Sequence, residues 1–346
     1  MSKPISSSQA PLAITIADIA KAAGVHAASV SRALSGTSSK VSAETRERIT
    51  RIARELGYQP NSLAAALRTK QTHMVAIVVP DIGNPLFAPI VEALEAELSK
   101  RGMMCLIAQT PHAAEGRRQL VVALAGRRVS GLLVLAAEGD DPMLAEAFRL
   151  GLPTVLVNRG FGERRFSSVV NNDEESVRLV IEHLLELGHL SIAHIAGPTE
   201  SSTGRARRSA YEDLCKQHGI EQSVIEATAF TREAGLIAAR ALFATGAIPS
   251  AIFAANDLIA MGVLDVLHER GLEVPSQISL VGHNDMPFVD LIAPPLTTVR
   301  IAVQELGRQG AQLLLELMAT PSQVPTMRVL APQLIVRKST APFKHP

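Results

Sequence analysis

The sequence of 346 residues contains no tryptophan, two cysteines and only eleven Phe and Tyr residues. The cysteines, Cys105 and Cys215, are isolated, which argues against a disulfide framework and a thiolate metal site. The longest apolar runs, such as Val75–Val79, fall far short of the roughly 18 residues that a membrane helix needs. The Ser-rich start, Met1–Leu12, has no apolar signal-peptide core. We therefore expect a cytoplasmic protein that does not associate with membranes.

Catalytic motifs are also absent. The sequence has no GxGxxG, no Walker loop, no G-x-S-x-G and no metal-ligand cluster. His189 and His194 flank the start of a strand, which predicts turn and core positions rather than a ligand pair. The acidic pairs Asp140–Asp141 and Glu174–Glu175 predict helix starts, where the helix dipole favours acids. We expect no catalytic residue, no metal and no cofactor.

The overall charge is nearly balanced, with 34 Lys and Arg against 33 Asp and Glu. The charge is unevenly distributed along the chain. Residues 1–70 carry ten Lys and Arg against four acids, a net charge of +6, whereas the remainder carries 24 against 29, a net charge of −5. With 47% hydrophobic residues the chain can bury a sizeable core. A basic head on an acidic body indicates a nucleic-acid module fused to a further domain.

From Thr15 onward, the pattern predicts three short helices. Thr15 and Asp18 have the spacing of a capping box, Gly24 suits the turn that ends the first helix, and further helices are predicted over 27–34 and 43–56. A helix, a Gly-containing turn and a second helix form the helix-turn-helix pattern, whose second helix enters the major groove of DNA. An ordinary three-helix bundle is the alternative, and the net charge of +6 favours DNA binding.

Four ordered motifs carry a resemblance to a known family. Residues 15–25 read TIADIAKAAGV, 29–34 SVSRAL, 41–46 VSAETR and 57–61 GYQPN. In these motifs the chain resembles the LacI family of bacterial repressors, and the resemblance extends to about residue 338. It implies an all-α helix-turn-helix head followed by a periplasmic-binding-protein-like α/β domain of two similar parallel-sheet subdomains. The implied organisation is a disordered tail over 1–13, the DNA-binding domain over 14–59, a hinge helix or linker over 60–71, an effector-binding and dimerisation domain over 72–338, and a C-terminal tail over 339–346.

The resemblance makes 27–34 the recognition helix. Arg32 occupies a position that reads a base edge in many relatives, where a bidentate contact with guanine would suit it. Ser29 and Ser31 match positions that hold the helix on phosphates. At His26, where relatives usually have Ser, a phosphate contact and an ordinary surface position both stay open. The DNA-binding residues that we expect are Thr15, His26, Ala27, Ala28, Ser29, Ser31, Arg32, Asn61, Ala64 and Leu67.

The segment over 60–71 is short and Ala-rich, and it starts with a good N-cap, Asn61. Isolated helices of this length are marginal in water, so we expect it to fold when two copies meet on DNA. By resemblance it is the hinge helix, and Leu67 aligns with the leucine that wedges into the minor groove and kinks the duplex. A simple linker, with Leu67 as a packing contact, is the alternative.

Beyond Gln71, apolar strand-like runs alternate with helical ones. We expect strands over 74–80, 104–109, 131–135, 154–157, 191–196, 251–255 and 279–282, and helices over 86–100 and 115–126. Such alternation predicts parallel sheets that are covered on both faces. Roughly 270 residues are too many for one such sheet, so two subdomains with a cleft are expected. Ligands of open α/β sheets bind at the carboxyl ends of the strands.

The resemblance places an effector site in that cleft. Three positions where sugar-binding relatives usually have Asp are Asn158, Asn171 and Asn284 here. The loss of three acceptor-only charges, while Arg207 is kept and Arg159 lies nearby, favours a carboxylate or phosphate ligand. A neutral sugar bound through Asn amides is the alternative. The effector-binding residues that we expect are Asp81, Asn84, Phe87, Asn158, Asn171, Ser201, Thr203, Arg207, Phe230, Asn256, Asp257, Asn284 and Asp285.

These features together predict a sequence-specific transcriptional regulator, a repressor whose affinity for its operator is controlled by a small molecule. We expect a homodimer on a pseudo-palindromic operator, because no heptads for a tetramerising coiled coil follow Val336. A sugar acid or other organic acid is the favoured effector. Induction, corepression and activation at some promoters all stay open. The rival interpretation is a solute-binding protein or a sugar-processing enzyme with a basic head.

Overall fold

The computed structural model describes residues 14–34, 41–58, 72–135, 140–160, 165–246 and 248–343. The chain divides into two compact units, Met1–Thr72 and His73–Pro346. The expected tail over 1–13 and the expected hinge over 60–71, with Asn61, Ala64 and Leu67, lie outside the described residues. None of the helices in the described ranges is both long and apolar enough to span a membrane.

The first unit, the head, contains α1 (Ile16–Ala23), α2 (Ala27–Leu34) and α3 (Ala43–Glu55). The predicted capping box is confirmed: the Thr15 hydroxyl accepts a hydrogen bond from the Asp18 amide, and the Asp18 carboxylate accepts one from the Thr15 amide. Gly24 ends α1 in the left-handed conformation with φ of 64°, which glycine adopts without strain. The second helix has the predicted bounds, and the third begins at the predicted Ala43 and ends at Glu55, one residue before the predicted end.

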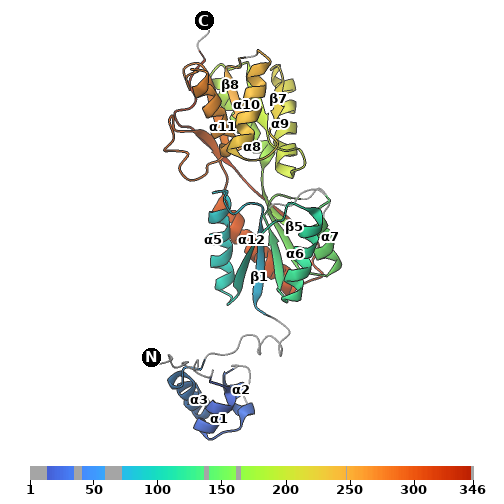
Figure 1. The fold of residues 1–346 in the computed structure, drawn as a ribbon, viewed down its shortest axis with the longest axis vertical. Helices are drawn as coiled ribbons and strands as arrows, with labels where there is room; N and C mark the ends of the chain where they lie inside the picture. Colours follow the sequence, from blue (N-terminus) through green and yellow to red (C-terminus); the bar gives the residue numbers. More distant parts are fainter. Residues whose placement is uncertain are drawn as a thin grey trace, which may run out of the picture. The chain divides into compact units, whose positions relative to one another are not determined.

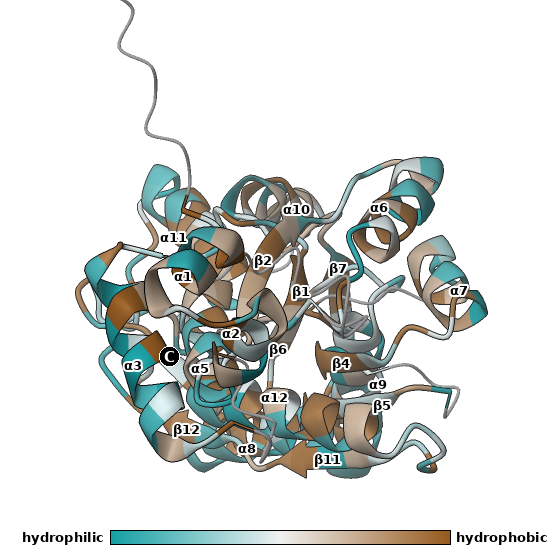
Figure 2. Cartoon of the chain, turned by 90° about the horizontal axis from the view of Figure 1, so that it is seen from below, coloured by the Kyte–Doolittle hydropathy of each residue, from teal (hydrophilic) through white to brown (hydrophobic). Residues whose placement is uncertain are grey.

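One buried residue from each helix forms the centre of the head. Ile19, Val30 and Ile49 are fully buried against one another. On α3 the polar and charged residues occupy the other faces, and its ribbon alternates between teal and brown in Figure 2. This amphipathic pattern explains why a unit with so few large hydrophobic residues folds as a three-helix bundle.

The second unit consists of two lobes, each built on one sheet (Figure 1). The first sheet has the order β11-β5-β4-β3-β1-β2, with β1 (Met74–Val79), β2 (Met104–Gln109), β3 (Gly131–Val134), β4 (Thr154–Asn158), β5 (Ser167–Asn171) and β11 (Met327–Leu330). All neighbouring strands in it are parallel. Val75 and Ile77 of β1 pack on one side of the sheet, and Ala76 and Val78 pack on the other. Both faces are thus buried, as expected for a parallel sheet.

Helices cover both faces of this first sheet. They are α5 (Phe87–Ser99) and α12 (Val303–Ala319) on one face, and α6 (Ala114–Gly126) and α7 (Pro142–Arg149) on the other. Helix α12 lies along α5 although more than two hundred residues separate them in the chain (Figure 1). Gly307 allows this approach, because a Cβ atom there would lie 2.6 Å from the carbonyl oxygen of Ile90.

The second sheet has the order β12-β10-β9-β8-β6-β7. Its strands are β6 (Ile192–Ala196), β7 (Ser223–Glu226), β8 (Ala251–Ala254), β9 (Ser279–Asn284), β10 (Thr297–Arg300) and β12 (Gln333–Ile335), and its helices are α8 (Asp173–Glu186), α9 (Ser202–His218), α10 (Arg232–Ala244) and α11 (Asp257–Glu269). All pairs are parallel except β10 with β12, which is antiparallel. The predicted pair of similar parallel sheets is confirmed, with this edge strand as the exception.

The chain passes between the lobes after β5, after β10 and between β11 and β12 (Figure 1). Residues 339–343, which the sequence assigns to a C-terminal tail, pack on the second lobe. The Ser339 hydroxyl is buried and donates to the Leu280 carbonyl at 2.6 Å, and the His189 ring bonds to the Ala341 carbonyl. His189 is thus part of this packing, and His194 lies fully buried in β6, so the predicted core position of His194 is confirmed.

The acidic pairs lie at helix starts, as the sequence predicts. Asp141 is the N-cap of α7, and its carboxylate accepts from the Met143 amide at 2.9 Å. Glu174 and Glu175 lie in the first turn of α8. At these positions carboxylates satisfy free amide groups and interact favourably with the helix dipole. Their placement is explained by helix capping.

Candidate functional site

A cavity of about 440 Å³ opens between the two lobes, at the carboxyl ends of strands from both sheets. Its lining residues are Pro80, Asp81, Asn84, Leu86, Phe87, His112, Asn158, Arg159, Pro198, Glu200, Ser201, Thr203, Arg207, Thr228, Ala229, Phe230, Thr231, Asn256 and Asn284. The segments that follow β1, β4, β6, β7, β8 and β9 all contribute. This is the place where open parallel sheets bind ligands, and the volume suits a small molecule.

Two asparagines end strands on opposite sides of the cavity. Asn158 is the last residue of β4, with φ of 72°, and Asn284 is the last residue of β9, with φ of 112°. Few non-glycine residues adopt such positive φ angles, and Asn is among those that do so most readily. Both side chains are buried. The backbone thus turns at these two positions and leaves an amide side chain beside the cavity.

Arg207 lines the cavity from α9, and its side chain is only 4% exposed. Its Nε donates to the carboxylate of Asp173 at 2.7 Å, and its Nη1 donates to the Ala255 carbonyl at 2.6 Å. Burial raises the pKa of Asp173, and the charge of Arg207 opposes that rise. The guanidinium is therefore held in one orientation, and Asp173 offsets its charge.

Arg159 and Phe230 contact each other in the cavity lining. The guanidinium carbon of Arg159 lies 5.1 Å from the centre of the Phe230 ring, a cation–π distance. The ring lies against Gly197, where a Cβ atom would come within 2.3 Å of it. Phe87, at the first turn of α5, adds a second aromatic face to the lining. The cavity therefore combines apolar ring faces with a guanidinium group.

Amide groups of the lining have defined partners. The Asn84 side-chain oxygen accepts from the Leu86 amide at 3.0 Å. Asn256 is the N-cap of α11: its side-chain oxygen accepts from the Ile259 amide, and its side-chain nitrogen donates to the Phe230 carbonyl at 3.3 Å. The carboxylates of the lining, Asp81 and Glu200, are exposed. The cavity lining thus contains both buried hydrogen-bonding groups and exposed acids.

Most of the residues that the sequence assigns to an effector site meet at this cavity. They are Asp81, Asn84, Phe87, Asn158, Ser201, Thr203, Arg207, Phe230, Asn256 and Asn284. Asn171, Asp257 and Asp285 do not line it. Asn171 lies behind Asn158 and donates to its side-chain oxygen at 3.4 Å. The motif residues therefore separate into a lining set and a set that lies behind it.

Asp257 and Asp285 are used inside the second lobe. Asp257 is fully buried, and it accepts from the Met286 amide at 2.8 Å and from the Thr298 hydroxyl at 2.6 Å. Its burial raises the pKa of its carboxyl to about 7, although both hydrogen bonds oppose the rise. Asp285 forms ion pairs of 2.7 Å with Arg300 and Arg337. Both acids hold the β9 and β10 ends in place.

The sequence-based residue set omitted several lining residues. Arg159, Pro198 and Glu200 lie in loops that follow strands, and the rule that ligands bind at strand ends indicates them. His112 follows β2, and Thr228 and Thr231 follow β7. The strand β7 is short and only half-buried, and it contains no long apolar run from which its end could be predicted.

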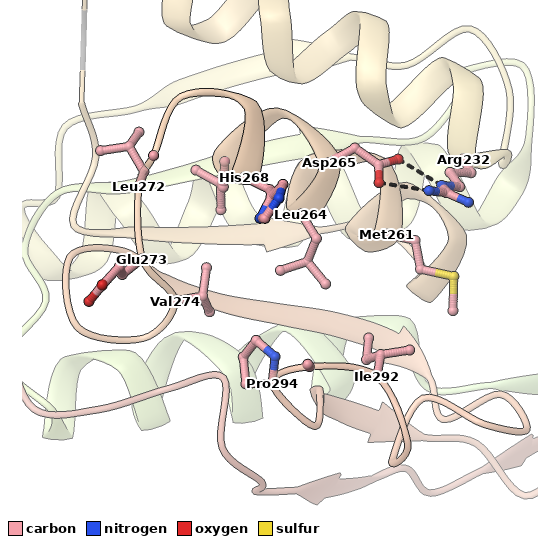
Figure 3. Close-up of a pocket in the computed structure, with 13 residues that line it drawn as sticks. Arg232, Met261, Leu264, Asp265, His268, Leu272, Glu273, Val274, Ile292 and Pro294 are labelled. Carbon is pink, nitrogen blue, oxygen red and sulfur yellow. Dashed lines mark hydrogen bonds and ion pairs between the residues drawn. The ribbon is translucent and has the colours of Figure 1, made fainter.

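A second cavity, of about 690 Å³, lies beside α11 and the segment at 292–294 (Figure 3). Its lining mixes apolar side chains, such as Met261, Leu264 and Ile292, with charged ones, and the ion pair between Arg232 and Asp265 lies at one end. It contains none of the expected effector residues and no strand end of the kind described above. The first cavity, which contains both, is therefore the candidate effector site.

In the head, the predicted DNA-contacting residues of α2 lie on its outer side, except Ala27, which is partly buried against the core of the head. Ala28 and Arg32 are exposed, and Ser29 and Ser31 are half-buried, while Val30 points into the core. The ring of His26 stands at the start of α2 and accepts from the Ala28 amide at 3.3 Å. The Thr15 side chain is part of the capping box of α1.

Within the described part of the chain, no group of three or more His, Cys, Asp or Glu side chains is placed to hold a metal ion. The thiols are also unsuited to reaction. Burial raises the pKa of Cys105 to about 11 and also raises that of Cys215.

Comparisons with known proteins agree with this arrangement. Residues 15–61 match the family model of bacterial regulatory proteins of the lacI family, and residues 181–340 match that of a periplasmic binding protein-like domain. The chain is 32% identical to the HTH-type transcriptional regulator DegA of Bacillus subtilis (strain 168), over 95% of this chain and 98% of DegA. It is 34% identical to the HTH-type transcriptional regulator CelR of Thermobifida fusca, over 94% and 98%.

Solved structures give the same result. The lac repressor dimer bound to operator and the anti-inducer ONPF superposes with a TM-score of 0.86 at 28% identity, over 95% of this chain and 99% of that one. The complex of the transcriptional regulator CelR with cellobiose superposes with a TM-score of 0.73 at 32% identity, over 94% and 99%.

Head and body together define a DNA-binding transcriptional regulator with an effector-binding domain. The chain belongs to the LacI family. Its relatives are regulators and not enzymes, so the rival interpretation as a solute-binding protein or sugar-processing enzyme is set aside.

Proposed function

We propose that this protein is a homodimeric repressor whose affinity for a pseudo-palindromic operator is set by a small molecule bound between the lobes. The observation that carries the proposal is that polar strand-end residues from both sheets meet at one cavity in a chain that also has a helix-turn-helix head. A ligand that contacts both lobes binds one relative arrangement of the lobes better than another. Such a difference in affinity is what a regulatory ligand needs.

The proposed contacts with DNA follow the sequence assignment. Arg32 on the exposed side of α2 reads a base, Ser29 and Ser31 contact phosphates, and the hinge over 60–71 places Leu67 in the minor groove. A helix-turn-helix dimer reads two half-sites that mirror its own two-fold symmetry. The similarity to the lac repressor dimer on its operator supports this arrangement. DNA in the cytoplasm is thus the proposed partner.

For the effector we propose a small polyhydroxylated molecule that carries a carboxylate. Two arginines, Arg159 and Arg207, line the cavity, and the aromatic faces of Phe87 and Phe230 suit the apolar side of a sugar ring. Arg159 lies over the Phe230 ring at the cavity, and Arg159 and Arg207 together are the proposed partners of the carboxylate. A charge-assisted contact of this kind is about twice as strong as a neutral hydrogen bond.

A neutral sugar is the second candidate, and two observations favour it. The ion pair of Arg207 with Asp173 reduces the positive charge of the cavity, and Asp81 and Glu200 add exposed negative charge. The structure of CelR with cellobiose also shows a relative with a neutral sugar. Calorimetry with D-galacturonate against D-galactose, and with D-gluconate against D-glucitol, separates the two. Tighter binding of the neutral member of each pair would refute the acidic effector.

The DNA-binding part of the proposal is tested by selecting sequences from a random duplex pool with the full-length protein at moderate salt. An enriched pseudo-palindrome is the expected result, either alone or after addition of a cell extract that supplies a corepressor. Arg32→Ala should reduce discrimination between the enriched site and a scrambled site by about 1–3 kcal/mol. Arg51→Ala on α3 also removes one positive charge, and it should weaken binding to the enriched site and to the scrambled site by the same factor. Failure of every pool to enrich would refute sequence-specific binding.

The hinge assignment has its own test in the same assay. Leu67→Ala should lose most of the affinity for the enriched site and leave effector binding intact, because a leucine wedge acts only on DNA. Unchanged DNA affinity in Leu67→Ala would reduce the segment over 60–71 to a simple linker.

A further inference from the structure

The side-chain oxygens of Asn158 and Asn284 are both held by groups behind the cavity. The Asn158 oxygen lies 3.4 Å from the side-chain nitrogen of Asn171, and the Asn284 oxygen lies 2.9 Å from Nδ1 of His283. Asn171 and His283 are themselves buried. The two cavity amides on opposite lobes thus share one arrangement, in which a buried neighbour contacts the oxygen.

The direction of each hydrogen bond follows from the atoms that stay without partners. Among the residues that the structure describes, Oδ1 of Asn171 and Nε2 of His283 are buried and have no hydrogen-bond partner. A neutral His283 that donates from Nδ1 leaves only a lone pair on Nε2. The reverse direction would bury an unpaired Nε2–H group, and buried orphan N–H groups are rarer than orphan acceptors.

The hydrogen bond between Asn171 and Asn158 has a defined direction for the same reason. When the Asn171 nitrogen donates, only its oxygen is left without a partner. When the direction is reversed, a buried NH₂ group is left instead, which costs more. His283 also stays neutral, because burial and then the nearby charge of Arg207 lower its pKa well below the ordinary value. In both pairs the oxygen of the cavity amide is therefore the acceptor.

A third amide of the lining follows the same rule. The Asn84 oxygen accepts from the Leu86 amide, so Asn84, Asn158 and Asn284 all have their oxygens occupied. Each oxygen therefore points toward its protein partner, and the NH₂ on the other side of each amide, which is a donor only, is the group available to a ligand in this arrangement. The guanidinium groups of Arg159 and Arg207 are donors too. The exposed carboxylates of the lining, Asp81 and Glu200, are the opposing acceptors.

We propose that His283 and Asn171 are positioning residues, which hold the oxygens of Asn284 and Asn158 so that the cavity selects a ligand presenting hydrogen-bond acceptors there, as a carboxylate does. This inference rests on the proposed function, because it takes the cavity as the effector site. A sugar hydroxyl both donates and accepts, so it gains less from NH₂ and guanidinium donors than a carboxylate, which only accepts.

The first test needs no ligand. Full-length protein labelled with ¹⁵N only at histidine reports the tautomer of each ring by NMR, and the signal missing in His283→Phe identifies His283. His194 is an internal reference, because its Nδ1 lies 2.9 Å from the Phe253 carbonyl and must donate to it. We expect His283 to carry its proton on Nδ1, as His194 does. A proton on Nε2 would turn the Asn284 amide around and overturn the proposal.

The second test measures selectivity. D-Galacturonate, D-gluconate and their neutral partners D-galactose and D-glucitol are each added at 10 mM, and the unfolding midpoint is recorded. We expect the acids to raise the midpoint more than their neutral partners, because a ligand stabilises the form that it binds. A panel in which no acid raises the midpoint, or in which the neutral members raise it more, overturns the proposed selectivity.

Matched variants tie the selectivity to the positioning residues. His283→Phe should reduce the ratio of acid to neutral affinity several-fold, up to about tenfold, which is the value of one hydrogen bond. His194→Phe is the control: His194 is equally buried on the same sheet, its Nε2 also has no partner among the described residues, and it holds no cavity amide. Equal effects of the two variants would mean that His283 only packs. Should His283→Phe fail to fold, Asn171→Ala tests the Asn158 arm in the same way.

The outcomes separate this inference from the function on which it rests. An enriched operator together with an Nε2–H tautomer at His283 leaves the repressor in place and refutes the positioning. The expected tautomer together with DNA binding that no effector alters refutes effector control, while the orientation of the amides stands.

Discussion

The Nε atom of Arg207 lies 2.7 Å from a carboxylate oxygen of Asp173, and both side chains are largely buried. Asp173 opens α8 directly after the chain leaves the first sheet, and Arg207 lies on α9. The ion pair therefore fixes one crossing between the lobes to the second lobe, beside the cavity. Arg207 therefore both lines the cavity and stabilises the fold.

Removal of one partner of this pair should be costly. Asp173→Ala leaves the charge of Arg207 buried and uncompensated, so we expect the free energy of unfolding to fall by about 3–5 kcal/mol. Asp213→Ala is the control, because Asp213 lies on α9 in an exposed pair with Lys216 at 3.8 Å. The free energy of unfolding of this variant should fall by less than about 1 kcal/mol. Urea unfolding of both variants measures the difference. Equal losses would show that the buried pair contributes no more than the exposed one.

Gly197 should tolerate no side chain, because Phe230 occupies the space. A Cβ atom at Gly197 would lie 2.3 Å from a ring carbon of Phe230, so Gly197→Ala must displace the ring and should cost about 1–3 kcal/mol. Gly126, at the end of α6, has open space around it and no positive φ, so Gly126→Ala should be neutral or stabilising by up to about 1 kcal/mol. Thermal unfolding distinguishes them. A Gly197→Ala protein as stable as Gly126→Ala would mean that Phe230 moves freely.

The sequence predicts elements whose signals are local. The helix over 27–34 matches α2, because a glycine turn and the spacing of apolar residues both lie within a few positions of it. The strands β7, β11 and β12 carry no continuous apolar run, since they lie at or near the sheet edges and are partly exposed. The return of α12 to the first lobe depends on contacts far along the chain, which no local pattern contains.

The same limit applies to the cavity. Strand ends are visible in the sequence, so Asn158 and Asn284 are found by their position. Whether a polar side chain at a strand end faces the cavity or the interior depends on its partners. Asp257 turns inward because the Met286 amide and the Thr298 hydroxyl bind it, and Thr298 lies 41 residues away. Spacing alone does not contain that information.

Asp257 should make stability depend on pH. Its pKa is raised to about 7 by burial, from an ordinary value of 3.8, so the folded protein holds a proton that the unfolded chain releases between about pH 4 and pH 7. Its contribution to stability is thus largest at low pH and is lost as the pH rises through 7. Asp257→Asn removes this dependence. The stability of the variant relative to that of the wild type should therefore increase from pH 5 to pH 8. Urea midpoints measured at both pH values test this, and a constant difference would contradict it.

His26 should act on DNA binding through the start of α2. Its ring nitrogen accepts from the Ala28 amide at 3.3 Å and its carbonyl accepts from the Ser29 amide, so it takes the place of an N-cap residue. Loss of a cap costs about 0.5–2 kcal/mol, so His26→Ala should weaken binding to the selected DNA by several-fold. His26→Asn keeps a capping oxygen and should bind like the wild type. A filter-binding titration of both variants decides between two roles of the ring: an equal loss in His26→Asn and His26→Ala would assign it to a contact with the DNA itself.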